Sequence, residues 1–187
     1  LSATYEPLVM KNADLVILEV NPNMPRTFGD TVVHVSEVDF LIEASYDIPQ
    51  LPIAEPSEKD KVIGAFIADL VEDGSTIQLG IGGIPNAVAA ALVNKKDLGI
   101  HTEMFTDGMV DLYNAGAITN KKKSLVPGKM VATFALGSKK LYDFIDDNPA
   151  VQIIRGEWVN DPHVIGQNHK MVSINTTLEI DLTGQCC

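Results

Sequence analysis

Two motifs in this chain carry residues that could bind a ligand and react with it. The first is a glycine-rich turn, Gly80–Ile84, which lies between an apolar stretch and a helical pattern. The second is Ile100–Glu103, where the next apolar stretch ends on a carboxylate. A strand that runs into a glycine turn and a helix brings backbone N–H groups close to a ligand. A neighbouring strand that ends at Glu103 would deliver a carboxylate to the same edge of the sheet.

One interpretation of the turn is the phosphate-binding loop of a dinucleotide fold. Gly80 and Gly82 fit the opening of G-x-G-x-x-G, and Glu103 stands where an acid would hold a ribose hydroxyl. Pro85, however, takes the place of the third glycine, which would allow close packing of helix and strand. Proline suits the first turn of a helix instead. The pattern therefore keeps an anion-binding turn and loses the dinucleotide detail, and a Glu103 that attacks an acyl group is the competing interpretation.

The elements around these motifs alternate between strand and helix. Short apolar, β-branched runs predict strands, and apolar residues repeating every 3.6 positions predict helices. The predicted strands are 13–21, 32–35, 38–43, 76–79, 99–103, 130–136, 151–154 and 172–180, and the predicted helices are 58–71, 87–93, 109–115 and 139–146. Strands that alternate with single helices imply right-handed βαβ units. We therefore predict an α/β fold with an open, mostly parallel sheet and flanking helices.

The chain divides at a proline-rich stretch. Pro49, Pro52 and Pro56 lie close together, and proline removes backbone donors and fixes φ. Ser57 then begins a helix as its N-cap, with Asp60 as the partner in a capping box. We predict parts of two domains, residues 1–50 and residues 57–187, with the connection between them.

Composition limits the classes of partner. The 187 residues carry a formal charge of −11, which argues against nucleic acid or an anionic membrane as the main partner. We find no signal-peptide pattern and no apolar run long enough to cross a bilayer. The adjacent Cys186 and Cys187 make a poor disulfide scaffold, which favours a reducing cytoplasm. Because the chain begins with Leu1 and stops soon after Gln185, we expect an internal fragment.

Several motifs together resemble a known family. Residues 80–88 (GIGGIPNAV) and 101–109 (HTEMFTDGM), followed by 117–125 (AITNKKKSL) and 173–185 (SINTTLEIDLTGQ), are similar to the acetyl-CoA hydrolase/transferase family of CoA-transferases. The likeness covers essentially the whole chain, and its nearest subgroup is the butyryl-CoA:acetate and 4-hydroxybutyrate CoA-transferases. It implies an enzyme about twice this size, with two open α/β domains that face each other across the active site.

The resemblance also assigns roles to residues. It implies that Glu103 is the catalytic nucleophile and that Asn160, which precedes Asp161-Pro162, helps to hold the thioester oxygen. The turn that would contact the CoA thioester consists of Gly80, Ile81, Gly82, Gly83 and Ile84. The implied partners are an acyl-CoA and a short-chain carboxylate, with coenzyme A as a substrate and no permanently bound cofactor. We also expect a homo-oligomer, although the sequence leaves its size open.

This chemistry suits a carboxylate. Glu103 would attack the thioester to give an acyl-glutamyl anhydride and then a glutamyl-CoA thioester, so ping-pong kinetics are expected. We expect butyryl-CoA and acetate as substrates, with 4-hydroxybutyrate CoA transfer or acetyl-CoA hydrolysis as alternatives in the family. A non-catalytic CoA-binding or nucleotide-binding module is the alternative from another class. No metal is expected, because the spacing of His34, His101, His163 and His169 is not that of metal ligands.

Other polar residues have simpler interpretations. Lys121–Lys123 could meet CoA phosphates, but a charge run is usually a solvated face, which we favour here. Glu179 and Asp181 would share one face of the last predicted strand, as ordinary strand-end polarity or as an acid–base pair. Trp158 and Phe134 are expected in the core.

Overall fold

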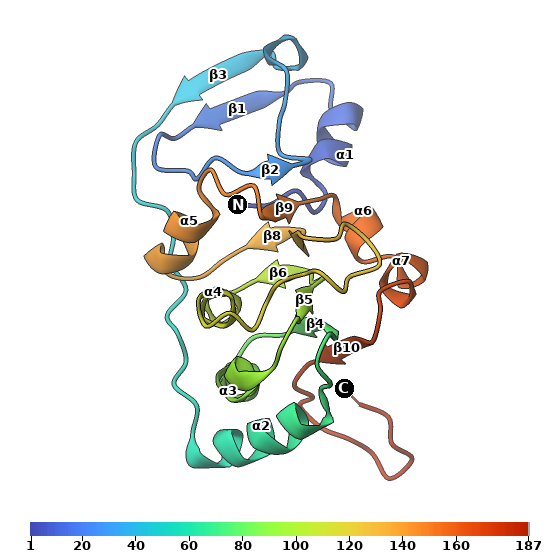
Figure 1. Ribbon diagram of the computed structural model, residues 1–187. Helices are drawn as coiled ribbons and strands as arrows, with labels where there is room; N and C mark the ends of the chain where they lie inside the picture. Colours follow the sequence, from blue (N-terminus) through green and yellow to red (C-terminus); the bar gives the residue numbers. More distant parts are fainter. Residues whose placement is uncertain (187) are drawn as a thin grey trace.

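The computed structural model describes residues 1–186. Cys187, one of the two adjacent cysteines from which a reducing cytoplasm is predicted, lies outside the described residues. A parallel sheet runs through the middle of the molecule (Figure 1). Its strands, in spatial order, are β10 (Met171–Ile174), β4 (Thr76–Leu79), β5 (Gly99–Ile100), β7 (Met130–Ala132), β9 (Val151–Ile153) and β2 (Phe28–Gly29). A parallel bridge between His101 and Val131 joins β5 to β7. Two further parallel pairs are β6 (Met104–Phe105) with β8 (Phe134–Ala135), and β1 (Ile17–Val20) with β3 (Phe40–Glu43).

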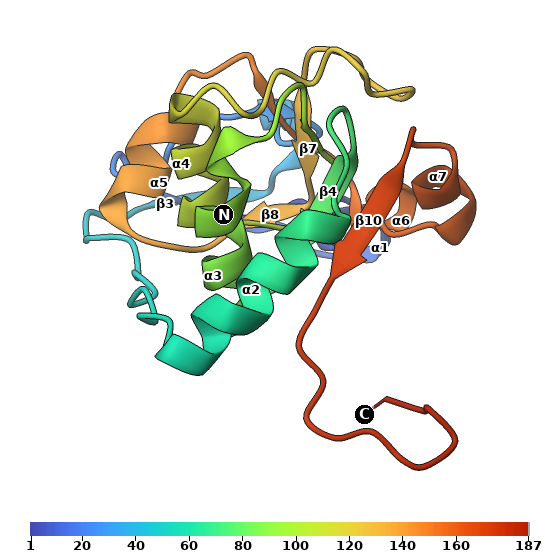
Figure 2. The ribbon, with the colours of Figure 1, turned by 60° about the horizontal axis from the view of Figure 1, so that its bottom comes forward.

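Helices cover both sides of this sheet. On one side lie α2 (Glu58–Leu70), α3 (Gly83–Ala91), η2 (Leu92–Asn94), α4 (Asp107–Asn114) and α5 (Lys139–Ile145). On the other lie α6 (Gly156–Val159) and α7 (Pro162–Gly166), and Figure 2 shows the same division from another direction. The remaining helices, α1 (Glu6–Asn12) and η1 (Val35–Glu37), belong to the N-terminal part. The predicted α/β fold with an open parallel sheet is confirmed.

The buried core explains why the sequences of the strands are continuous apolar runs. Ile77, Leu79, Ile100 and Met130 are fully buried, and they pack against apolar side chains of α3, α4 and α5. Parallel strands covered by helices have no solvated face over most of their length, so alternation of apolar and polar residues is weak. The order of strand followed by helix along the chain is therefore the sequence signal that predicts this fold.

Helix α2 has the predicted start and an unexpected surface. Ser57 and Asp60 form the complete capping box, with both the side chain and the backbone of each engaged. The helix packs on α3 through the small residues Gly64 and Ala68, which are buried. Of its apolar stripe, Phe66 remains 69% exposed and Leu70 81% exposed. The 3.6-residue pattern thus predicted the helix correctly, but most of the stripe does not face the core of the described chain.

The predicted strand 32–35 is wrong, and the predicted strand 172–180 extends too far. Residues 32–35 form no strand, because His34 caps the short helix η1 through its Nδ1 atom. The last strand ends at Ile174, and the following residues are exposed, with Leu178 at 96%. Glu179 and Asp181 are therefore not alternate residues of a strand, and Asp181 instead accepts hydrogen bonds from Thr183 within its own turn.

The proline-rich connection is extended and anchored. Residues 44–57 run along the edge of the molecule past α5 and α4 to α2 (Figure 1). The N–H of Leu51 donates to the Gly137 carbonyl, and the Tyr142 hydroxyl donates to the Pro49 carbonyl. The predicted domain limits, 1–50 and 57–187, fall within this connection, and that division stays a prediction. Across it, β2 from the first part pairs with β9 from the second.

No helix within residues 1–186 combines the length and the apolar character that crossing a membrane requires.

The contact between α2 and α3 gives a test of the fold. A Cβ atom at Gly64 would lie 2.8 Å from the Ala87 carbonyl carbon, closer than packed atoms approach. Gly64→Ala should therefore lower the free energy of unfolding by about 1–3 kcal/mol, despite the better helix propensity of alanine. Urea denaturation measures this change. The matched control is Gly166→Ala, where a Cβ meets nothing within 4 Å. Equal stability of the two variants would contradict the described packing.

Candidate active site

Glu103 lies at an interruption between two strands. The pairs His101–Val131 and Met104–Phe134 have the same register offset, so the ladder continues past the interruption without an added residue. The predicted strand 99–103 therefore does not end on the carboxylate, because β6 resumes the pairing directly after it. At the interruption, the Glu103 carbonyl accepts the N–H groups of Thr133 and Phe134, at 2.8 and 3.2 Å. The Glu103 side chain is exposed, so the backbone is fixed while the carboxylate is accessible.

Asn160 lies against this carboxylate. Its Nδ2 atom donates to Glu103 Oε1 at 3.4 Å, a long hydrogen bond. Asn160 occupies the junction of α6 and α7, where Asp161 caps α7 by accepting the His163 N–H at 2.7 Å. Asp161, and not Asn160, therefore caps the turn before Pro162. The structure brings together the two residues that the resemblance names as catalytic.

The N-terminal residues hold α6 beside the Glu103 strand. The Ala3 N–H donates to the Thr133 carbonyl, and the Thr4 and Thr133 hydroxyls lie 2.6 Å apart. The Thr4 carbonyl then accepts the Gly156 N–H at the start of α6. Thr133 thus contacts both the Glu103 backbone and Thr4, which holds the start of α6. Sequence reasoning missed this support, because the residues are far apart along the chain and of ordinary types.

The glycine turn adopts the conformation that its sequence demands. Gly82 has φ of +111°, which L side chains rarely adopt, and it immediately precedes α3. Because α3 begins at Gly83, with Pro85 in its first turn, the helix starts before the predicted residue 87. The Gly80 N–H donates to the Ile174 carbonyl of β10. An Asp60 carboxylate oxygen lies 2.5 Å from where a Cβ of Gly83 would be, so a carboxylate already faces the start of α3.

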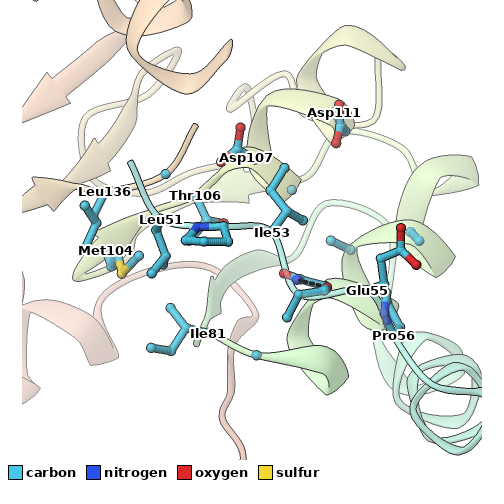
Figure 3. Close-up of a pocket in the computed structure, with 18 of the residues that line it drawn as sticks. Leu51, Ile53, Glu55, Pro56, Ile81, Met104, Thr106, Asp107, Asp111 and Leu136 are labelled. Atoms are coloured by element: carbon cyan, nitrogen blue, oxygen red, sulfur yellow. Dashed lines mark hydrogen bonds between the residues drawn. The ribbon is translucent and has the colours of Figure 1, made fainter. Parts of the chain in front are cut away.

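An apolar cavity of about 590 Å³ lies on the α3 and α4 side of the sheet (Figure 3). Ile81 and Gly82 line it together with Met104 and Leu136, and the connection from Leu51 to Pro56 closes one wall. Glu103 is not among its lining residues. Glu103 is a bend ahead of β6, and its side chain contacts Asn160, whereas Met104 lines the cavity. Of the predicted turn residues, Ile81 and Gly82 line this cavity, whereas Gly80, Gly83 and Ile84 do not, and the contact between Glu103 and Asn160 lies outside it.

Comparison with known proteins assigns the chain to a family. The model of the acetyl-CoA hydrolase/transferase C-terminal domain matches residues 137–187. A succinyl-CoA:cyclohexane-1-carboxylate CoA transferase from Geobacter metallireducens is 51% identical over all of this chain and 43% of its own length. The 4-hydroxybutyrate coenzyme A transferase of Clostridium kluyveri is also 51% identical, with the same coverage of both chains. The chain belongs to the acetyl-CoA hydrolase/transferase family.

A solved CoA-transferase has the same fold. The 4-hydroxybutyrate CoA-transferase of Porphyromonas gingivalis matches with a TM-score of 0.95 at 45% identity, over 99% of this chain and 47% of that chain. The expected CoA-transferase-like fold is therefore confirmed. The chain spans less than half the length of the curated relatives that it matches.

One lysine of the predicted solvated run is buried in this CoA-transferase fold. Lys123 is only 4% exposed, while Lys121 and Lys122 are exposed. The Lys123 Nζ atom donates to the carbonyls of Ile100, at the end of β5, and Lys129, just before β7, each at 2.8 Å. Burial lowers the pKa of Lys123 from 10.5 to about 7. The prediction of a solvated run is wrong at Lys123, which links two central strands.

No group of three or more His, Cys, Asp or Glu residues within residues 1–186 is arranged to hold a metal ion. His101 is buried behind Glu103, where its Nε2 atom contacts the Val159 carbonyl. His34 contacts Ser36 in the N-terminal part. These two histidines therefore occupy separate environments.

The burial of Lys123 predicts a pH dependence of stability. Between pH 7 and about 10.5 the unfolded chain holds more protons on this group than the folded chain does, so stability should rise with pH. The rise should reach at most about 4 kcal/mol, since each pKa unit corresponds to about 1.4 kcal/mol. We expect the difference in unfolding free energy between wild type and Lys123→Met to grow from pH 7 to 9.5 in favour of wild type. Lys122→Met is the exposed control, and parallel pH curves for wild type and Lys123→Met would count against the shift.

Proposed function

We propose that the protein transfers coenzyme A between an acyl-CoA and a carboxylate acceptor through a glutamyl-CoA thioester on Glu103. The observation that carries the proposal is the contact of the Asn160 amide with the exposed Glu103 carboxylate, 3.4 Å apart, in a CoA-transferase fold. A nucleophile beside a hydrogen-bond donor is the arrangement that acyl transfer requires. Membership of the acetyl-CoA hydrolase/transferase family supports the reaction class.

The first half of the reaction loads CoA onto the protein. A Glu103 oxygen attacks the thioester carbonyl, the C–S bond breaks, and the products are an acyl-glutamyl anhydride and CoA thiolate. The thiolate then attacks the glutamyl carbonyl of this anhydride. The C–O bond to the acyl carboxylate breaks, which releases that carboxylate and leaves glutamyl-CoA.

The second half repeats these steps in reverse with the acceptor. The acceptor carboxylate attacks the glutamyl-CoA carbonyl and expels CoA thiolate, which then attacks the acceptor's acyl carbon. The new acyl-CoA leaves, and the Glu103 carboxylate is regenerated. One carboxylate leaves before the next is bound covalently, so the kinetics are ping-pong, and no net proton, metal or redox equivalent is consumed.

Asn160 is proposed to stabilise the oxyanion in these steps. Each attack converts a carbonyl oxygen into an oxyanion, and a donor already in place near the attacking carboxylate can meet it. Removing one such donor typically costs about 3–4 kcal/mol, or about 10²–10³-fold in kcat. The turn Gly80–Ile84 is proposed to contact the CoA thioester, and the cavity lined by Ile81 and Gly82 gives it an apolar surface.

We propose butyryl-CoA and acetate as the substrate pair, with 4-hydroxybutyrate as the alternative acceptor. The relatives at 51% identity are named for cyclohexane-1-carboxylate and for 4-hydroxybutyrate, so overall identity favours no single acid. A thioester hydrolase needs only that water reach glutamyl-CoA. A non-catalytic CoA-binding module would bind the nucleotide without any covalent adduct. We further propose that the protein is cytoplasmic and forms a homo-oligomer. Gel filtration and light scattering would measure the size of the oligomer.

Replacing the nucleophile tests the mechanism directly. In the full-length protein, Glu103→Gln should reduce CoA exchange by at least about 10³-fold, because an amide is a poor nucleophile. Incubation with butyryl-CoA, borohydride reduction and peptide mass spectrometry should locate the modified residue at Glu103 in wild type only. Glu179→Gln is the matched control and should retain both exchange and labelling. Full exchange activity in Glu103→Gln, or labelling of another residue, would refute the proposal.

Comparing kcat/KM among carboxylic acids identifies the preferred acceptor. With butyryl-CoA as donor, we expect the kcat/KM for acetate to exceed that for 4-hydroxybutyrate, cyclohexane-1-carboxylate and succinate, measured by chromatography of the acyl-CoA products. The same assay without an acceptor measures hydrolysis. A higher kcat/KM for another acid would identify that acid, rather than acetate, as the preferred acceptor. Free CoA formed at the rate of exchange would identify a hydrolase.

A further inference from the structure

A buried histidine connects the Glu103 strand to the residue beside Asn160. His101, two residues before Glu103, is 1% exposed, and its Nε2 atom lies 2.8 Å from the Val159 carbonyl. Because a carbonyl only accepts hydrogen bonds, the proton must be on Nε2. The ring also packs against Trp158, with the ring centroids 5.7 Å apart and the planes tilted by 51°. Both contacts are to α6, the helix that ends immediately before Asn160.

The other ring nitrogen has no hydrogen-bond partner. His101 Nδ1 is buried and unpaired among the described residues, so Nε2 makes the single polar contact of the ring. Burial lowers the pKa of His101, which keeps the ring neutral and Nδ1 without a proton. A group so fully enclosed is placed to act on Val159 rather than on a substrate.

Helix α6 needs such a contact. It has only four residues, too few to be stable alone, and its position depends on what holds it. The Thr4 carbonyl holds its first residue, Gly156, and His101 holds its last, Val159. Without the second contact, the helix end and Asn160 have no polar link to the Glu103 strand other than the long bond to Glu103 itself.

We propose that His101 is a positioning residue that fixes the Asn160 amide at the distance from Glu103 that oxyanion stabilisation requires. The proposal rests on the proposed function of Glu103 and Asn160. Because His101 and Glu103 are two residues apart in the segment that joins β5 to β6, the same backbone sets the place of the nucleophile and of the amide. A shift of the amide by about 1 Å costs up to about 10²-fold in rate.

The test uses variants that separate the hydrogen bond from the shape of the ring. In the full-length protein, His101→Phe keeps an aromatic ring against Trp158 but cannot donate to Val159. His101→Gln places an amide N–H near the position of Nε2. With butyryl-CoA and acetate, kcat should fall about 10–100-fold in His101→Phe and less than about 5-fold in His101→Gln. The KM for butyryl-CoA should change little in either, because a positioning residue does not bind substrate.

A double-mutant cycle shows whether the effect passes through Asn160. If His101 acts by placing that amide, His101→Phe should cost less than about 3-fold in an Asn160→Ala background. Fold-changes that multiply, or a His101→Gln variant as impaired as His101→Phe, would overturn the inference. Thermal unfolding monitors folding, and His101→Asn, whose amide is too short to reach Val159, replaces His101→Phe should that variant not fold. Full activity of Glu103→Gln would instead refute the proposed function, so the two failures are distinguishable.

Discussion

The site depends on one irregular residue, Glu103, which interrupts a strand while the parallel pairing continues in the same register on both sides of it. Pairing on either side of Glu103 has the same register, and both Thr133 and Phe134 donate to the Glu103 carbonyl. The main chain at this residue is therefore fixed by its neighbour, although the residue belongs to no strand. A side chain at such a break remains accessible on a rigid base. This is what a nucleophile requires, since a carboxylate on a mobile loop would lose its orientation toward the bond that it attacks.

Long-range contacts bring the partner amide to this break. Asn160 follows a four-residue helix, α6, which tertiary contacts must hold in place. The Thr4 carbonyl anchors one end of α6, and His101 anchors the other. Thr133 contacts both the Glu103 backbone and Thr4, so one residue links an anchor of α6 to the proposed nucleophile. The geometry of the proposed oxyanion site is thus set by tertiary contacts that hold α6 against the sheet, and not by α6 alone.

The proposed nucleophile and the glycine turn have different surroundings. Glu103 contacts Asn160 at the end of α6, and Trp158 of the same helix packs against His101. The apolar cavity is lined by Ile81 of the glycine turn and by Met104. The turn therefore connects the sheet edge to an apolar space, and the Asp60 carboxylate faces the start of its helix. The Asp60 carboxylate disfavours a phosphate at the start of α3, because a carboxylate repels an anion there.

The sequence by itself determined the α/β class, most element positions, the family and the identity of Glu103 and Asn160 as candidates. These depend on local signals: the period of apolar residues, the Ser57–Asp60 capping box, the proline-rich connection, and the conformation that only glycine at position 82 adopts readily. Only the tertiary structure decided that the strand resumes after Glu103, that Lys123 is buried, that residues 175–180 leave the sheet, and that His101 holds α6. The physical reason is that burial and hydrogen-bond partners are set by segments distant in the chain, and no local pattern of residues encodes which carbonyl a lysine or a histidine will meet.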